Sequence, residues 1–242
     1  MSMQARPRVV VVGSFNVDHV WHCDSLPRPG ETRAGHYRTG PGGKGFNQAT
    51  ASARCGVETV FVCALGDDDG GRLARTLAAA DGIDLRAEDS GEPTGTAGIH
   101  VDAHGNNSIV IGPGANGALS AEFVARQAEA ISGARIVLAQ LESPVESVLE
   151  AMRIARAAGV RTILNPAPAN ALAPRELLAV RPGRQPGGRS TRSGGSKRTI
   201  TGQPSGHQKA EIASIIRFLF YRVWRGLAGP SGKLPTPTVP HR

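Results

Sequence analysis

The chain has 242 residues, of which 40% are hydrophobic, and a formal net charge of +8. This length can bury one sizeable core, and no stretch holds the ~20 consecutive apolar residues that cross a bilayer, so we expect no membrane span. Three cysteines without metal-ligand spacing and the lack of a hydrophobic leader favour a cytoplasmic protein over a secreted disulfide scaffold.

The charge is unevenly distributed along the chain. Residues 1–180 carry 16 Lys and Arg against 19 Asp and Glu, whereas residues 181–242 carry 12 against 1. The two parts therefore have net charges of −3 and +11. This division predicts a mildly acidic folded body followed by a strongly basic tail.

The first predicted element is a strand over residues 9–12, four valines closed by Gly13. Such a run is typical of a strand that is buried on both faces of a sheet. The chain then leaves the sheet at its carboxyl end, where open α/β sheets bind ligands. Asn16 and Asp18 alternate with apolar residues, so both can face one cleft, where an amide beside a carboxylate suits the vicinal hydroxyls of a sugar. The alternative is that both side chains cap the turn.

Residues 19–41 alternate polar and apolar positions around Pro27 and Pro29. These short strands do not fit a βαβ crossover, so we predict a small β flap that projects from the main sheet. Residues 94–112 read as a hairpin that turns at residues 104–106, and we assign them to the second half of this flap.

Residues 40–49 read Gly-Pro-Gly-Gly-Lys-Gly-Phe-Asn-Gln-Ala. The glycines, Gly42 and Gly43 among them, allow the backbone to approach a ligand closely. A helix is predicted over residues 44–55, and free backbone N–H groups at its start can hold hydroxyl or phosphate oxygens. Its first residues supply three donor side chains, Lys44, Asn47 and Gln48. Gly45 excludes a Walker A loop, which needs Ser or Thr after the lysine. A glycine-rich turn at the start of an ordinary helix is the alternative.

Three consecutive acids, residues 67–69, follow a predicted strand over residues 59–65. They precede a predicted helix over residues 72–80, where acids cap the first turn and complement the helix dipole. We therefore interpret them as structural and not as metal ligands.

The body continues with a helix capped by Ser120, and further elements are predicted over residues 135–139, 145–158 and 161–164. Their alternation of strand and helix predicts an α/β fold, a Rossmann-like α/β/α sandwich that carries the flap. Glu142 follows the strand at 135–139 and can reach the same cleft as Asp18. Its alternative role is a helix-capping acid before Pro144.

Four segments together carry a family resemblance: residues 8–18, 40–49, 66–68 and 140–144. In this order they resemble the ribokinase-like (PfkB) family of carbohydrate kinases, most closely its ribokinases, over about residues 8–180. The resemblance implies ATP-dependent phosphorylation of ribose or a similar pentose, with ATP, Mg²⁺ and a monovalent cation such as K⁺ as cofactors. It implies that the flap is a lid over the sugar and a surface for a homodimer. The substrate-binding residues that it implies are Asn16, Asp18, Gly42, Gly43, Lys44, Asn47 and Glu142.

The family's catalytic motifs have no match in this sequence. The base in the family is the Asp of a Gly-Ala-Gly-Asp motif, whereas no aspartate follows Asp102 here. No Asn-x-x-Glu motif for the metal-bound nucleotide is found either. We therefore assign no catalytic, cofactor-binding or metal-binding residue, and predict that the chain keeps the sugar-binding half of the family's site and lacks the catalytic and ATP-binding half. The alternative is an inactive truncated or frameshifted fragment that retains sugar binding or dimerisation.

The predicted tail is unlike a domain in composition. Residues 181–206 are rich in Gly, Pro, Ser and Arg with few apolar residues, which predicts disorder. Residues 208–226 show apolar residues at helical spacing with basic neighbours, a pattern that either forms a helix for an anionic membrane or partner, or is accidental. The aromatic residues of the tail cluster within this segment and do not interleave with arginines, so we expect no nucleic-acid partner.

Overall fold

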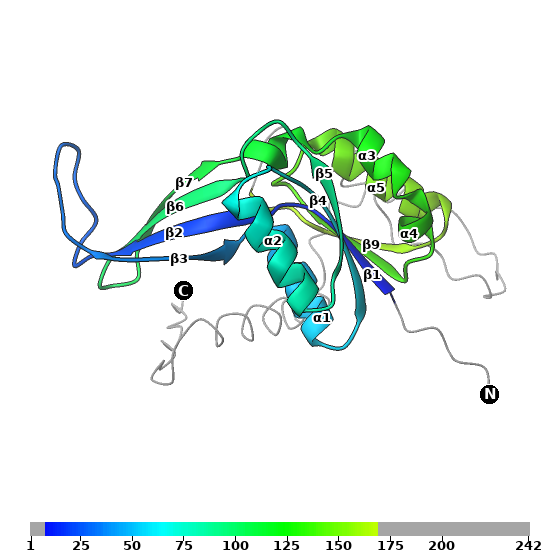
Figure 1. The fold of residues 1–242 in the computed structure, drawn as a ribbon, viewed down its shortest axis with the longest axis horizontal. Helices are drawn as coiled ribbons and strands as arrows, with labels where there is room; N and C mark the ends of the chain where they lie inside the picture. Colours follow the sequence, from blue (N-terminus) through cyan, green and yellow to red (C-terminus); the bar gives the residue numbers. More distant parts are fainter. Residues whose placement is uncertain (1–7, 169–242) are drawn as a thin grey trace, which may run out of the picture. The chain divides into compact units, whose positions relative to one another are not determined.

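The computed structural model describes residues 8–168, which form two β-sheets and the helices that pack on the larger one (Figure 1). The predicted tail at 181–242 and its helix at 208–226 lie outside the described residues. The larger sheet has the strand order β5-β4-β1-β8-β9, and every neighbouring pair is parallel. Its strands are β1 (Arg8–Val12), β4 (Glu58–Leu65), β5 (Asp84–Asp89), β8 (Ile136–Gln140) and β9 (Arg161–Asn165).

Helices cover both faces of this sheet, which confirms the predicted α/β sandwich (Figure 1). On one face lie α1 (Lys44–Arg54) and α2 (Asp69–Ala80). On the other face lie α3 (Ala121–Arg126), α4 (Ala128–Ser132) and α5 (Val145–Ala157). None of the helices within residues 8–168 has both the length and the apolar character that crossing a membrane would require.

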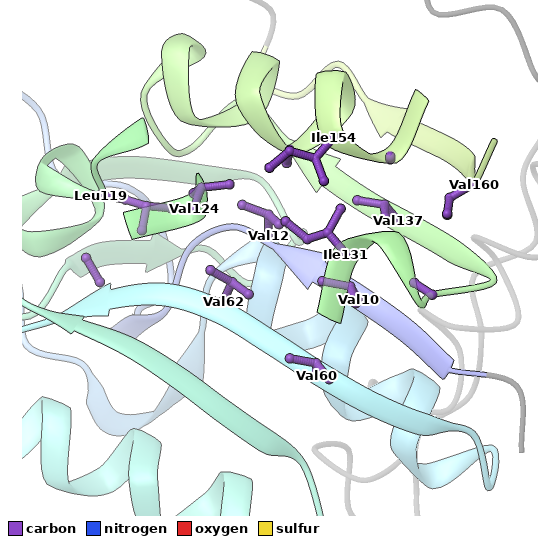
Figure 2. Close-up of a cluster of buried hydrophobic side chains, with 14 of the residues drawn as sticks. Val10, Val12, Val60, Val62, Leu119, Val124, Ile131, Val137, Ile154 and Val160 are labelled. Atoms are coloured by element: carbon purple, nitrogen blue, oxygen red, sulfur yellow. The ribbon is translucent and has the colours of Figure 1, made fainter. Parts of the chain in front are cut away.

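The valine run of β1 is buried on both sides, as predicted. Val10 and Val12 point into a cluster with Val124 of α3 and Ile154 of α5, and Figure 2 labels these four side chains. Val11 points the opposite way, into a cluster with residues of α1 and α2. Successive residues of a strand face opposite sides of the sheet, so a continuous apolar run suits a central strand with a helical layer on each face.

The smaller sheet is the predicted flap. Its order is β3-β2-β6-β7, with β2 and β6 parallel and the outer pairs antiparallel, and it projects from the larger sheet (Figure 1). The strands are β2 (Asn16–His22), β3 (His36–Gly42), β6 (Thr96–Val101) and β7 (Asn107–Gly112). The carboxylate of Asp102 accepts hydrogen bonds from the backbone of His104 and Asn106, and this fixes the turn between β6 and β7.

Strand β5, helix α4 and the 3₁₀ turn η1 (Gly114–Ala118) were not predicted, and helix α2 begins earlier than predicted. Strand β5 has the sequence Asp-Leu-Arg-Ala-Glu-Asp and lies at the edge of the larger sheet. An edge strand is paired on one side alone and tolerates charged residues, so its sequence lacks the apolar pattern by which a strand is recognised. Helix α4 has five residues, too few for a helical repeat to be recognised. Helix α2 begins at Asp69, three residues before the predicted start at 72.

The acidic turn before α2 has the structural role that the sequence indicated. The Asp68 carboxylate caps α2 by accepting from the backbone N–H of Gly71 at 2.8 Å. It also accepts from the backbone N–H and the hydroxyl of Thr94, at 2.7 and 2.6 Å. Burial alone would raise the pKa of Asp68, but these hydrogen bonds outweigh it and lower the pKa. Asp68 thus ties the start of α2 to the segment that enters the flap.

Candidate functional site

The predicted site residues come from three places that meet where the flap joins the larger sheet. Asn16 and Asp18 begin β2, directly after β1. Gly42 ends β3, opposite Asn16 in the register, and Gly43 and Lys44 lead into α1. Glu142 follows the carboxyl end of β8, the neighbour of β1. This is the sheet edge where ligand sites of open α/β folds lie.

The Glu142 carboxylate is held by three hydrogen bonds from two residues, Ser14 and Lys44. Its Oε2 accepts from the Ser14 hydroxyl at 2.6 Å and from the backbone N–H of Lys44 at 2.8 Å. Its Oε1 accepts from the Lys44 ammonium at 2.7 Å, and only 9% of the Glu142 side chain is exposed. Hydrogen bonds to an ionised group are short and strong, so this carboxylate has one fixed position.

The start of α1 differs from the prediction of free N–H groups, which was wrong. Lys44 donates its backbone N–H to Glu142, Phe46 donates to the Ser14 carbonyl at 2.9 Å, and Gly45 makes a longer contact of 3.4 Å to the Ser14 hydroxyl. The anion that the helix dipole favours at this end is thus the protein's own carboxylate. Glu142 does cap a helix, but this helix is α1 and not the one that follows Pro144.

Two glycines are required by the space around them. Gly43 has φ of +87°, and a methyl group on it would lie 2.7 Å from the Ser14 carbonyl oxygen. A methyl group on Gly42 would overlap the carboxylate of Asp18. The glycine-rich segment therefore lets β3 lie close to Asp18 and lets α1 begin against Ser14, whereas the predicted close approach to a ligand stays a prediction.

Asp18 has the least favourable environment of the charged groups in this region. It is half-buried, and no residue within 8–168 donates a hydrogen bond to its side chain. The pKa of Asp18 is raised to about 6, chiefly by burial and further by the nearby Glu142 carboxylate, while His19 and Lys44 act in the opposite direction. A carboxylate in this state gains from any ligand that donates hydroxyl hydrogens to it.

The other predicted residues differ in how they are held. Asn16 is 4% exposed, and its Oδ1 accepts from Nδ2 of Asn116 at 2.7 Å. Asn47 lies one turn after Lys44 on α1, is half-buried, and makes no side-chain hydrogen bond to the described part of the chain. Gln48 accepts from Nε2 of the fully buried Gln140 at 2.6 Å and thus joins α1 to β8.

Sequence reasoning missed Ser14 and Asn116 as parts of the site. Ser14 stands beside the predicted residues, and its place directly after a buried strand was the available signal. Asn116 lies in a 3₁₀ turn, η1 (Gly114–Ala118), one hundred positions from Asn16. Only the folded chain brings these two side chains together.

The described residues lack a cluster suited to a metal ion, and the backbone N–H groups at the start of α1 are not open to an external anion. Within residues 8–168, no group of three or more His, Cys, Asp and Glu side chains has a metal-binding arrangement. The N–H groups that start α1, a natural cradle for a phosphate, are occupied by Ser14 and Glu142. The geometry thus offers hydrogen-bonding groups for a polar, hydroxylated ligand.

Comparison with known proteins identifies the family. The profile described as the pfkB family carbohydrate kinase matches residues 6–183. The chain belongs to this family. It is 43% identical to the ribokinase of Haemophilus influenzae over 179 residues, which cover 72% of the chain and 58% of that enzyme. It is 45% identical over 175 residues to the bifunctional ribokinase/ribose-5-phosphate isomerase A of Fructilactobacillus sanfranciscensis, covering 71% of the chain and 32% of that protein.

Solved structures agree with the family assignment. The ribokinase of Arabidopsis thaliana complexed with ribose and ATP superposes with a TM-score of 0.61 at 35% identity. The match covers 72% of this PfkB-family chain and 58% of the Arabidopsis chain. The fold of the described residues is thus a ribokinase fold, and the chain spans about a third to three fifths of the length of these relatives.

Replacing Gly42 with alanine is expected to lower the free energy of unfolding by about 2 kcal/mol, because the methyl group takes the space of the Asp18 carboxylate. Gly40→Ala on the same strand is the matched control, since a methyl group there meets no heavy atom within 4 Å. Urea unfolding measures both variants. In a chain that also carries Asp18→Ala, the loss of unfolding free energy caused by Gly42→Ala should largely disappear. An unchanged loss in this double variant would show that the methyl group does not clash with the Asp18 carboxylate.

The pKa of Asp18 predicts how stability depends on pH. An acid whose pKa rises from 3.8 to about 6 on folding destabilises the folded state once the unfolded chain ionises. Stability should therefore fall as the pH rises through this window. Asp18→Asn should be more stable than wild type by roughly 1–2 kcal/mol at about pH 7, a value reduced for solvent screening of a half-buried group. Urea unfolding measures the difference in stability between Asp18→Asn and wild type at each pH. The same difference at about pH 3.5 as at neutral pH would contradict the raised pKa of Asp18.

Proposed function

We propose that this PfkB-family chain binds a pentose such as ribose at the junction of flap and sheet, through Asn16, Asp18, Gly42, Gly43, Lys44, Asn47 and Glu142. The observation that carries the proposal is the half-buried Asp18 carboxylate, which has no donor among the described residues and stands beside the fixed Glu142–Lys44 pair. A sugar diol donates hydroxyl hydrogens to such a carboxylate and accepts from amide and ammonium groups. The named ribose and ATP ligands of the Arabidopsis relative support the substrate class.

The roles of the glycines and the flap follow from this placement. Gly42 gives the sugar access to Asp18 because it carries no side chain above the carboxylate. The flap begins at the same junction, with Asp18 in its first strand, and we propose that it closes over the sugar as a lid. A closed lid excludes water from a phosphoryl acceptor.

We propose further that the chain holds the acceptor sugar without phosphorylating it. Phosphoryl transfer needs a base at the acceptor hydroxyl and positive charge around the transferring group. The sequence has no Gly-Ala-Gly-Asp motif for this base, and no aspartate beyond Asp102. The family resemblance implies ATP, Mg²⁺ and K⁺, and within residues 8–168 no group of three or more His, Cys, Asp and Glu side chains is arranged for a metal ion.

Exposed apolar residues on the flap favour a homodimer through this sheet. Rings of His19, Trp21, Tyr37 and His100 stack on one face, with centroids of neighbouring rings 5.1–6.3 Å apart. Trp21 and Tyr37 are 36% and 53% exposed, and Val110 is 72% exposed. Removal of large apolar groups from water stabilises association, and aromatic residues are enriched at interfaces.

Isothermal titration calorimetry with ribose, together with an ATP-dependent phosphorylation assay on the same full-length sample, tests the binding proposal. We expect ribose to bind and no ribose phosphate to form. Asp18→Ala should abolish the heat of binding, because the ligand loses its charged acceptor, while Asp69→Ala, an exposed acid on α2, should leave it unchanged. Turnover of ribose would refute binding without catalysis, and the absence of ribose binding would refute the sugar site itself.

Sedimentation velocity tests the flap interface. Trp21→Asp is expected to convert a dimer to a monomer, because it places a charge within the exposed aromatic face. Arg38→Asp is the control, since Arg38 lies beside Tyr37 on the same strand and faces the opposite side of the flap. A wild-type chain that sediments as a monomer, or a Trp21→Asp variant that stays dimeric, would overturn this assignment.

A further inference from the structure

Asn116 makes three hydrogen bonds to the segment that carries the candidate site. Its side chain is 3% exposed and lies against the link between β1 and β2. Oδ1 accepts from the backbone N–H of Phe15 at 2.9 Å. Nδ2 donates to the carbonyl of Phe15 at 2.9 Å and to Oδ1 of Asn16 at 2.7 Å. All hydrogen-bonding groups of the Asn116 amide except one lone pair are therefore used.

This arrangement determines which way the Asn16 amide points. The backbone of Phe15 has a fixed donor and a fixed acceptor, so the Asn116 amide can bind both in one orientation only. Its Nδ2 then faces Asn16, and an NH₂ group can only donate. The atom of Asn16 that meets it must be the oxygen. The amide orientation of Asn16 thus follows from an unambiguous backbone contact.

The Nδ2 group of Asn16 is consequently the part left for a ligand. Across residues 8–168 no acceptor for this group is found, and it is not among the fully buried side-chain atoms that lack a partner. Asn16 and Asp18 lie on the same side of β2 because they are two positions apart along the strand. An NH₂ donor therefore stands next to a carboxylate acceptor.

We infer that Asn116 is a positioning residue that makes Asn16 present a hydrogen-bond donor beside the Asp18 acceptor. The inference rests on the proposed sugar site and adds a rule of specificity to it. One hydroxyl of the ligand must accept, through its oxygen, from Asn16. The neighbouring hydroxyl must donate its hydrogen to Asp18. A ligand that lacks the accepting oxygen loses the contact with Asn16 even when its shape is unchanged.

Gly95 encloses the pair of asparagines. A methyl group on Gly95 would lie 2.5 Å from Oδ1 of Asn16 and would overlap Nδ2 of Asn116. The Gly95 carbonyl also accepts from the backbone N–H of Val17 at 2.8 Å, so this contact is fixed to β2. The Gly95 backbone therefore shields the hydrogen bond between the two amides from water. The methyl group of Gly95→Ala would clash with both amides and should disrupt this hydrogen bond.

Side-chain amide NMR of the full chain without ligand tests the orientation alone. Both Asn116 NH₂ hydrogens should exchange slowly with water, whereas those of Asn16 should exchange fast. In Asn116→Asp the new side chain can only accept, so the Asn16 amide turns to donate to it and its hydrogens become protected. Asn106→Asp, in the turn of the flap, is the control and should leave the exchange of Asn16 unchanged. Slow exchange at Asn16 in the wild type would overturn the inference.

Calorimetry with ribose analogues tests the consequence for recognition. For each ring hydroxyl we compare a deoxy analogue with a fluoro analogue, because fluorine accepts but does not donate. At one position the wild type should bind the fluoro analogue several-fold more tightly than the deoxy analogue, and Asn116→Asp should remove this preference. Ribose itself should bind about tenfold more weakly to Asn116→Asp, the equivalent of one hydrogen bond.

The two experiments separate the possible failures. If ribose does not bind to the wild type, the proposed sugar site fails, and the exchange data still decide the orientation of Asn16. If ribose binds but no position shows a fluoro preference, the inference about Asn116 is wrong. Should Asn116→Asp not fold, Gly95→Ala replaces it, with faster exchange of Asn116 and the same loss of preference expected.

Discussion

The hydrogen bonds of Glu142 are the constraint on which the rest of the site depends. One carboxylate joins the carboxyl end of β8, the loop after β1 through Ser14, and the first residue of α1 through Lys44. Each hydrogen bond to a charged group contributes about 1.5–3 kcal/mol, so these three elements are held together more strongly than packing alone would hold them. Because Gly43 and Asn16 are next to these contacts, their positions are determined by the same interaction.

The charges of the site leave one carboxylate without a partner. Lys44 forms an ion pair with Glu142. Asp18 forms no such pair: Glu142 repels its negative charge, and His19 and Lys44 attract it without a direct contact. A fold that needed only stability would have an uncharged residue at this position, since burial of an unpaired charge is unfavourable. This cost is expected of a site whose remaining hydrogen bonds come from a ligand. A bound ligand would then replace the hydrogen bonds to water that the Asp18 carboxylate loses on folding.

Much of the fold could be predicted from the sequence, because its signals are local. The valine run of β1, the Ser120 cap of α3 and the prolines of the flap each act within a few residues. Among the elements that were missed, β5 and α4 lack such signals: the first is rich in charged residues and the second is too short for periodicity. The motif residues of the site could be predicted for the same reason, but their contacts could not. Nothing near Glu142 in the sequence indicates that it caps α1, ninety-eight positions away.

Asn116 shows why the polarity of a site is harder to predict than its composition. An asparagine in a cleft can donate or accept, and the sequence gives no basis for a choice. In this chain the backbone of Phe15 makes the choice, because its N–H and C=O cannot exchange places. Phe15 thereby fixes the orientation of the Asn116 amide, and Asn116 in turn fixes that of Asn16. Side chains far apart in the sequence can thus transmit the fixed polarity of a backbone segment to a binding surface. For this PfkB-family chain, the pattern of donors and acceptors at the candidate site is therefore a property of the fold and not of the motif.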